Sequence, residues 1–241
     1  MKGKTALIVD DEEFLREIIS EELQRNGIKV LEASNGAMAF DIFQSENPDI
    51  IITDIRMPGG NGIDLLKRVK AANAVMPVVL LMTAFSDYSD DQIYDMGADA
   101  IFSKPFKPKV LVNELKKYLV PLKERLIQRD TSISAKLSYE LTCTSLEDAQ
   151  EKGVLKLGRC GIFIQTEVCP TLSVKDFVHF KIKLTNLDKT LEGLGICQWI
   201  RRNPHPELRP GYGLEIVELN SEAMDIVLDN IEKKRSLIPQ I

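Results

Sequence analysis

Residues able to do chemistry follow the short apolar runs in the first half of this 241-residue chain. These residues are Asp10 and Asp11, Asp54, Thr83 and Lys104. Carboxylates that meet in one crevice cannot all stay ionised without a counter-charge, so such a cluster calls for a hard cation such as Mg²⁺, bound through oxygen ligands. Beside a metal and an ammonium group, Asp54 can attack a phosphoryl group and become an acyl phosphate.

These side chains meet only if the runs that carry them are neighbouring strands. Apolar runs alternate here with amphipathic stretches of helical periodicity. The expected strands are 5–9, 28–31, 50–52, 78–82 and 100–102, and the expected helices are 14–23, 35–46, 63–70, 87–96 and one from 107. Such repeats predict an α/β, doubly wound parallel sheet with helices on both faces. Ligands of such sheets bind at the carboxyl ends of the strands, where the groups above lie.

The motifs VDDE (9–12), TDIRMP (53–58), MTA (82–84) and SKPF (103–106) resemble those of the response-regulator receiver family. The resemblance covers roughly residues 4–120, within an expected receiver domain of residues 1–120, and it implies the flavodoxin-like fold of that family. It further implies a phosphohistidine donor on a sensor histidine kinase or phosphotransfer protein. The implied roles are Asp54 as phosphoacceptor, Asp11, Asp54 and the backbone carbonyl of Arg56 as Mg²⁺ ligands, Asp10 assisting through water, and Lys104 and Thr83 contacting the phosphoryl group.

Each of these residues also has an ordinary structural explanation. Asp11 can cap a helix, Thr83 can cap the next one, and Lys104 can be a solvated loop residue. Their joint occurrence in one order favours the phosphorylation site. One position departs from the family, because Ile101 stands where an aromatic residue usually lies three positions before the lysine, with Phe102 beside it. The usual relay from threonine to that aromatic ring is therefore not expected.

Composition argues against several classes of protein. The net charge of −5 resides in residues 1–120, and the rest holds 17 basic and 17 acidic residues, so no DNA-binding output is expected. Four cysteines without a CxxC pair, together with two histidines, argue against a zinc site. No stretch is long enough to span a bilayer and no signal peptide is recognisable, which predicts a cytoplasmic protein.

A leucine stripe continues from the first half into residues 121–130, which we interpret as a helical linker. Leu111, Leu115 and Leu119 recur at helical spacing, and Pro121 interrupts the helix before the stripe resumes. In one interpretation these leucines only pack on the first domain. In the other, the part beyond Pro121 is a relay or dimer helix.

The second half, residues 131–241, has the alternating pattern of strands. We expect strands at 132–142, 154–157, 162–166, 177–184, 191–201 and 212–217, and a helix at 221–234 with Ser221 as its N-cap. This pattern predicts a small antiparallel β-barrel with a C-terminal helix. His179 is interpreted as a strand residue and His205 as a loop residue; neither has an evident nucleophile partner, so no enzyme is expected.

Several features of this half resemble the PilZ family: the RxxxR of Arg125 and Arg129, GIFI at 161–164, GICQW ending at Trp199, and PGYGLEI from Pro210. The resemblance implies that the two arginines grip cyclic di-GMP, because a planar guanidinium pairs with phosphate or guanine. The family's second motif is altered. Lys156 stands in place of an acceptor and Gly158 in place of a serine, which weakens nucleotide binding unless Lys156 meets a ligand phosphate.

Two hypotheses follow. In the first, a response regulator phosphorylated on Asp54 controls a PilZ-like output domain that binds cyclic di-GMP. In the second, the PilZ-like domain binds no nucleotide, and the chain is a phosphorylation-switched module that docks on a downstream protein.

Overall fold

The computed structural model describes residues 3–73, 76–84, 87–120, 124, 134–157, 161–166, 171–202 and 210–236. The chain divides into two compact units, the first built on residues up to Val120 and the second on Pro121–Lys233. Each unit has its own hydrophobic core.

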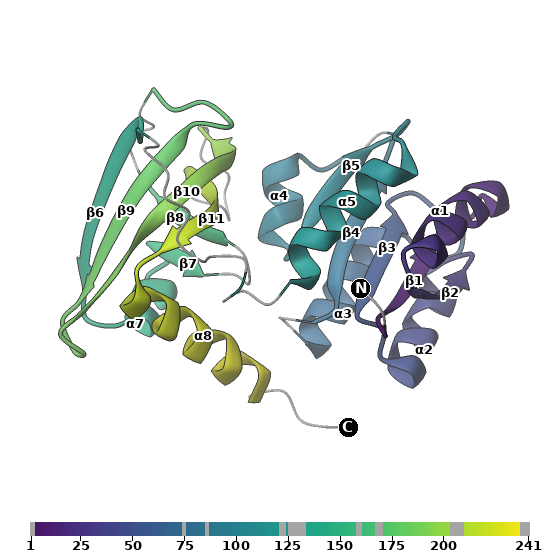
Figure 1. Ribbon diagram of the computed structural model, residues 1–241, viewed down its shortest axis with the longest axis horizontal. Coiled ribbons are helices and arrows are strands. Elements are labelled where there is room, and N and C mark those ends of the chain that lie inside the picture. Colours follow the sequence, from purple (N-terminus) through teal and green to yellow (C-terminus); the bar gives the residue numbers. More distant parts are fainter. Residues whose placement is uncertain are drawn as a thin grey trace. The chain divides into compact units, whose positions relative to one another are not determined.

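The first unit is a five-stranded parallel sheet in the order β2-β1-β3-β4-β5, as predicted. Figure 1 shows helices on both faces of this sheet. Its strands are β1 (Thr5–Val9), β2 (Lys29–Ala33), β3 (Ile50–Asp54), β4 (Val78–Thr83) and β5 (Ala100–Ser103), and its helices are α1 (Glu13–Arg25), α2 (Gly36–Glu46), α3 (Gly62–Ala72), α4 (Asp90–Asp95) and α5 (Pro108–Leu119).

The central strands β1, β3 and β4 are apolar along almost their whole length because helices cover both of their faces. Every residue of β3 is buried, and Asp54 is its last residue. Asparagine caps then start the helices at fixed points, since Asn35 Oδ1 accepts from the Met38 amide at 2.9 Å and Asn61 Oδ1 from the Asp64 amide at 2.7 Å. The polar strand ends are thereby held at one edge of the sheet.

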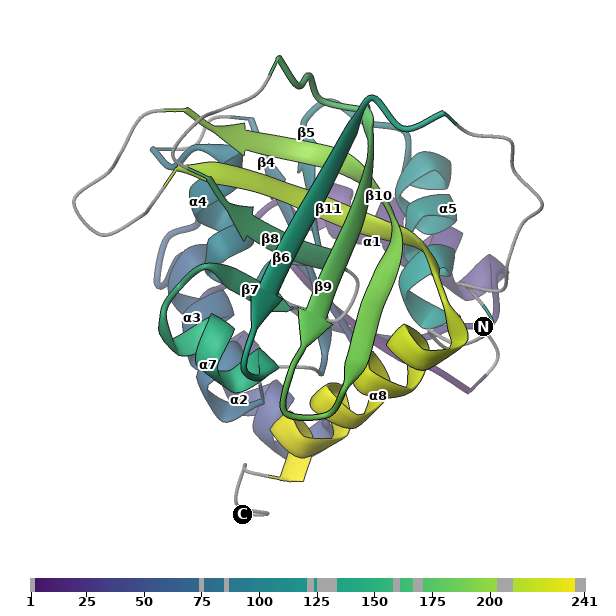
Figure 2. The ribbon, with the colours of Figure 1, turned by 90° about the vertical axis from the view of Figure 1, so that its left-hand side faces the viewer.

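The second unit is a six-stranded sheet in the order β6-β9-β10-β11-β8-β7, shown in Figure 2. Helices α7 and α8 share the core of this sheet, contributing Leu146 and Ala149 from α7 and Ala223 and Val227 from α8. The elements are β6 (Leu137–Cys143), α7 (Leu146–Glu151), β7 (Leu155–Leu157), β8 (Gly161–Gln165), β9 (Phe177–Leu184), β10 (Lys189–Arg201), β11 (Gly211–Leu219) and α8 (Ser221–Ser236).

The prediction of a purely antiparallel barrel was wrong in one pairing. Strand β6 runs parallel to β9, with Leu137 opposite Val178 and Cys143 opposite Leu184. Alternation along β6 shows which side chains face the core, but it is the same for either strand direction. Within the described residues β6 and β7 are the two edges of the sheet, which is therefore a half-barrel. Helix α7 was not predicted, because it is only 6 residues long.

The cap of α8 also differs from the prediction. Ser221 is already helical and exposed, and the residue before it supplies the cap: Asn220 Oδ1 accepts from the Ala223 amide at 2.7 Å. The backbone amide of Asn220 donates to the backbone carbonyl of Glu192 on β10 at 2.9 Å. The same residue therefore also fastens the start of the helix to the sheet.

The linker with Pro121, Arg125 and Arg129 lies outside the described residues, so neither interpretation of it is tested there. Leu111 and Leu115 of α5 are fully buried. None of the helices in the part of the chain that the structure describes is long and apolar enough to cross a membrane.

Replacing the cap separates the two assignments for α8. We expect Asn220→Ala to lower the free energy of unfolding of the second unit by about 1 kcal/mol, because an amide of the first turn loses its acceptor. Ser221→Ala is the matched control and should change stability by less than about 0.5 kcal/mol. Urea unfolding of both variants measures this, and a larger loss for Ser221→Ala would contradict the assignment.

Candidate functional site

Three predicted residues meet at the carboxyl edge of the parallel sheet. Lys104 Nζ lies 2.8 Å from Asp10 Oδ2 and 3.1 Å from Asp54 Oδ1. Asp10 follows β1, Asp54 ends β3, and Lys104 follows β5. One ammonium group therefore bridges two carboxylates that lie far apart in the sequence.

Backbone contacts fix the position of each of these three residues. Asp10 is fully buried, and its Oδ1 accepts from the Glu12 amide at 3.0 Å. The Lys104 amide donates to the Thr83 carbonyl at 2.7 Å, which continues the pairing of β4 with β5 past the strand ends. Thr83 itself follows Met82, the register partner of Asp54.

The loop after Asp54 needs glycine at one position. A Cβ on Gly62 would overlap the backbone carbonyl of Asp54, and no side chain can give way there. The Gly62 amide donates to the Ile55 carbonyl at 2.9 Å, and the Thr53 hydroxyl donates to the Asp54 carbonyl at the same distance. The turn thus folds tightly over the strand end that carries Asp54.

The electrostatics of the three groups are coupled. Burial raises the pKa of the Asp54 carboxyl; the Lys104 ammonium, by hydrogen bond and by charge, offsets only part of this, while the Asp10 charge adds to it. Burial acts to lower the pKa of Lys104, but its hydrogen bonds and charge attraction with Asp10 and Asp54 outweigh burial and raise it. The site therefore holds two carboxylates against one firmly protonated lysine.

The donor set fits a hard divalent cation in part. Asp10 and Asp54 offer carboxylate oxygens on either side of Lys104, and oxygen ligands of this kind are the ones that such a cation prefers. Asp11 is exposed, and among the described residues no three His, Cys, Asp or Glu side chains are gathered closely enough to hold a metal. The roles of Asp11 and of the Arg56 carbonyl as ligands stay predictions.

An ion pair beside the site was not foreseen from the sequence. Arg56 Nη2 lies 2.6 Å from Asp87 Oδ1, which links the loop after β3 to the segment after β4. Both side chains are largely exposed, so the pair contributes about 0–1 kcal/mol. Asp87 was expected to begin a helix at 87–96, whereas α4 begins only at Asp90 and leaves Asp87 in the preceding loop. Nothing in the sequence indicated that this residue meets Arg56.

The switch position, three residues before Lys104, is Ile101, where the family usually has an aromatic residue. Ile101 is half-buried and packs against the core of the first unit. The neighbouring Phe102 ring lies 5.8 Å from the Phe106 ring, at an angle of 54°. Strand β5 therefore carries an aromatic ring at Phe102, and not at Ile101, where the family usually has one.

The residues expected to bind cyclic di-GMP are only partly described. Lys156 is exposed on β7, opposite Phe163 of β8, whereas Arg125, Arg129 and Gly158 lie outside the described residues. Phe163 in turn stacks on Trp199 at 5.2 Å between ring centroids, and the Arg201 guanidinium lies 5.2 Å from the Trp199 ring. The GIFI and GICQW motifs thus supply one aromatic cluster.

The remaining residues singled out in this half have structural explanations. His179 lies in β9, with Nε2 3.1 Å from Glu192 Oε1, on a half-exposed part of the sheet. Burial raises the pKa of the Cys197 thiol to about 11, which makes it an unreactive core residue. His205 lies outside the described residues.

The chain matches the family model described as the response regulator receiver domain over residues 6–116. It is 38% identical to the phosphate regulon transcriptional regulatory protein PhoB of Pseudomonas aeruginosa over 121 residues, which are 49% of this chain and 53% of that protein. It is 36% identical to the sporulation initiation phosphotransferase F of Bacillus subtilis over 124 residues, which are 51% of this chain and 98% of that protein.

Among solved structures, the chain is similar to that of the response regulator protein TrrA of Thermotoga maritima in complex with Mg²⁺ and BeF, with 36% identity, a TM-score of 0.45, and coverage of 48% of this chain and 99% of that one. The chain spans about half the length of PhoB and nearly all of the sporulation protein.

Replacing Asp54 tests the electrostatics of the site. Because the folded state raises its pKa, an ionised Asp54 destabilises the fold, and this cost appears as the pH rises through that pKa. We expect Asp54→Asn to raise the Tm at pH 7 by roughly 2–6 °C. At a pH low enough to protonate Asp54, the two proteins should melt alike. Thermal unfolding across this pH range measures the difference, and a variant less stable at neutral pH would contradict the account.

Proposed function

The chain belongs to the response regulator receiver domain family, and from this premise we propose that it is a cytoplasmic two-component response regulator phosphorylated on Asp54. The donor is a phosphohistidine on a sensor histidine kinase or phosphotransfer protein. The observation that carries the proposal is the Asp10–Lys104–Asp54 arrangement, in which one lysine reaches both buried carboxylates.

The chemistry follows from the positions of these groups. An Asp54 oxygen attacks phosphorus, the bond from phosphorus to the histidine nitrogen breaks, and the imidazole keeps the electron pair. Lys104, held by Asp10 at 2.8 Å, places a positive charge where the phosphoryl oxygens gather. When Mg²⁺ is bound, by Asp10, Asp11, Asp54 and the Arg56 carbonyl, it supplies further charge neutralisation at those oxygens.

In this proposal Thr83 responds to the phosphorylation of Asp54. It is the last residue of β4, directly after Met82, the register partner of Asp54, and its carbonyl already accepts a hydrogen bond from the Lys104 backbone amide. A hydroxyl that turns toward the new phosphoryl oxygens would pull on the segment between β4 and α4. With Ile101 at the switch position, the movement cannot pass to an aromatic ring there.

Fluoroberyllate, which mimics a phosphoryl group, tests the site without a kinase. In the presence of Mg²⁺ we expect its addition to shift the amide resonances of Asp54, Thr83 and Lys104. The shifts should be absent in Asp54→Asn, whose amide cannot form the acyl-like bond. An unchanged spectrum of the native protein at saturating fluoroberyllate and Mg²⁺ would refute the proposal.

We further propose that the second unit is a PilZ-like output domain that binds cyclic di-GMP through Arg125 and Arg129, with Lys156 meeting a ligand phosphate. Support comes from the exposure of Lys156 at the sheet edge and from the aromatic cluster that begins opposite it. The alternative is a protein-docking module. Lys156 favours that alternative, because it has only donors where a guanine edge would need an acceptor.

Calorimetric titration with cyclic di-GMP separates the two functions. If the nucleotide binds, Arg129→Ala should weaken it at least about tenfold, since a charge-assisted pair is worth roughly 1.5–3 kcal/mol. Lys183→Ala, an exposed lysine on β9, is the matched control and should bind normally. Absence of heat at millimolar ligand would leave the docking module as the function.

A further inference from the structure

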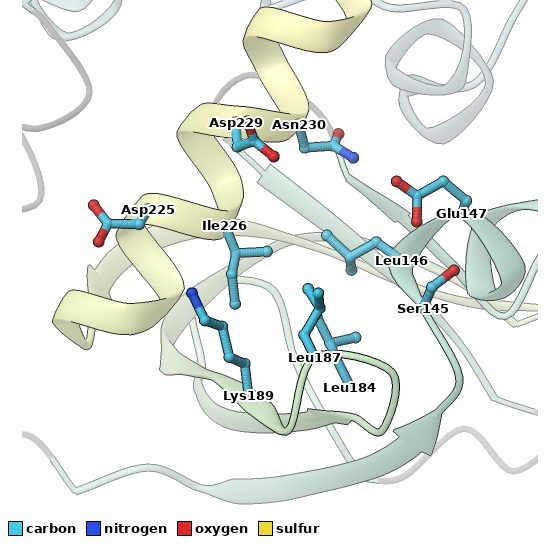
Figure 3. A pocket seen from close by; sticks show the side chains of 10 residues that line it. All are labelled: Ser145, Leu146, Glu147, Leu184, Leu187, Lys189, Asp225, Ile226, Asp229 and Asn230. Atoms are coloured by element: carbon cyan, nitrogen blue, oxygen red, sulfur yellow. The ribbon is translucent and has the colours of Figure 1, made fainter.

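A cavity in the second unit holds charged groups that water already solvates. Its volume is about 440 Å³, and Figure 3 shows it between α8, the start of α7 and the turn between β9 and β10. The carboxylates that line it, those of Glu147, Asp225 and Asp229, belong to exposed residues, so their charge calls for no ligand. Arg16 of the first unit is different, because its charge is largely buried beside the phosphorylation site.

Arg16 is a cation at the end of a helix that does not favour one. It is the fourth residue of α1, which begins at Glu13. The N-terminal end of a helix carries a partial positive charge, and a cation in this region is therefore unfavourable. The Arg16 side chain is nevertheless only 14% exposed. Its position must therefore depend on acceptors outside its own helix.

The Arg16 guanidinium joins strand β2 to the turn that follows β1. Its Nε lies 3.2 Å from Glu32 Oε2 on β2, and Ser20 Oγ donates to the other oxygen of Glu32 at 2.7 Å. Its Nη1 lies 2.8 Å from the backbone carbonyl oxygen of Asp10 and 3.4 Å from that of Asp11. A guanidinium is planar and presents its donors in a rigid fork, so the ion pair with Glu32 also fixes the direction of Nη1.

These contacts hold the backbone that carries the two acidic residues after β1. The Asp10 amide donates to the Ala33 carbonyl of β2 at 3.2 Å, and Asp10 Oδ1 accepts from the Glu12 amide at 3.0 Å. Because Arg16 holds the Asp10 carbonyl, the peptide between Asp10 and Asp11 cannot rotate without breaking a charge-assisted hydrogen bond. This peptide determines where the Asp11 carboxylate can lie relative to that of Asp10.

We propose that Arg16 is a positioning residue for the divalent-cation site. It holds the turn in the shape that lets the Asp10 and Asp11 carboxylates meet Mg²⁺ together with that of Asp54. The inference rests on the proposed function, which places Mg²⁺ beside Asp54. Arg16 acts through the two backbone carbonyls and does not contact the cation itself.

Charge and positioning predict opposite effects of removing Arg16. The loss of a positive charge beside these carboxylates should by itself strengthen the binding of Mg²⁺ through Coulomb attraction. The loss of a brace should weaken that binding, because the cation must then order the turn as it binds. The direction of the change therefore identifies the role of the residue.

Titration of the full chain with Mg²⁺, followed by amide resonances, measures this direction. We expect Arg16→Ala to need about tenfold more Mg²⁺ for half-saturation, as is usual when a residue that orients metal ligands is lost. Arg16→Lys should lie between this variant and the native protein, because one ammonium cannot bind Glu32 and the Asp10 carbonyl in the same fork. Arg25→Ala is the matched control: it removes the same charge from an exposed ion pair with Glu21 on α1 and should leave the affinity unchanged.

Two further measurements separate positioning from a loss of structure. Without Mg²⁺, the Glu12 amide should exchange its hydrogen faster in Arg16→Ala, while the amide resonances of β4 keep their native positions. At saturating Mg²⁺, acetyl phosphate should phosphorylate Asp54 of Arg16→Ala within about twofold of the native rate, because a uniform loss of cation binding raises the Mg²⁺ requirement and leaves the maximal rate.

Mg²⁺ binding by Arg16→Ala that is unchanged or tighter would overturn the inference. A phosphorylation rate that stays low at saturating Mg²⁺ would also overturn it, because Arg16 would then act in the transfer itself. If Arg16→Ala does not fold, Arg16→Lys decides alone: with the charge unchanged, native affinity would overturn the inference and weaker binding would support it. Weaker Mg²⁺ binding by the variants, in a protein that is never phosphorylated on Asp54, would support the inference and refute the proposed function.

Discussion

The structure of the first unit depends on one buried charge arrangement, the Lys104 ammonium between Asp10 and Asp54. Two carboxylates and a lysine at the end of an apolar sheet are costly to bury, and they are tolerated only because each is paired and held by backbone groups. The parallel order β2-β1-β3-β4-β5 brings their three strands to one edge. Breaking that order would leave at least one buried charge without a partner.

Much of the first unit could be predicted from its sequence because its information is local. Each strand is an apolar run, each helix has its own periodicity, and the chemical groups sit at the junctions. The contact between Arg56 and Asp87 escaped prediction, since it joins two loops 31 residues apart. The sequence also predicted that Asp11 and Asp54 bind Mg²⁺ together. In the structure the two carboxylates that share Lys104 are those of Asp10 and Asp54.

The fold of the second unit was harder to predict, because the alternation of apolar and polar residues does not encode the direction or the order of the strands. The β6 side chains alternate as expected, yet the strand pairs in parallel with β9. The paired residues are distant in the sequence: Ser138 and His179, for example, are 41 residues apart. The predicted cap of α8, Ser221, was wrong by one residue, and the cap is Asn220. Asparagine and serine are both preferred cap residues, so the sequence did not distinguish the two positions. The cavity beside α8 joins α7, a turn and α8, so no single stretch of sequence indicates it.

The central claim is that Asp54 is the residue that accepts the phosphoryl group. Incubation with acetyl phosphate and Mg²⁺, reduction with borohydride and peptide mass spectrometry locate an acyl phosphate directly, because the reduced aspartate becomes homoserine. We expect homoserine at position 54 alone, with none formed in Lys104→Ala at the same reaction time. Homoserine at Asp10 or Asp11 instead, or no conversion of any aspartate, would contradict it.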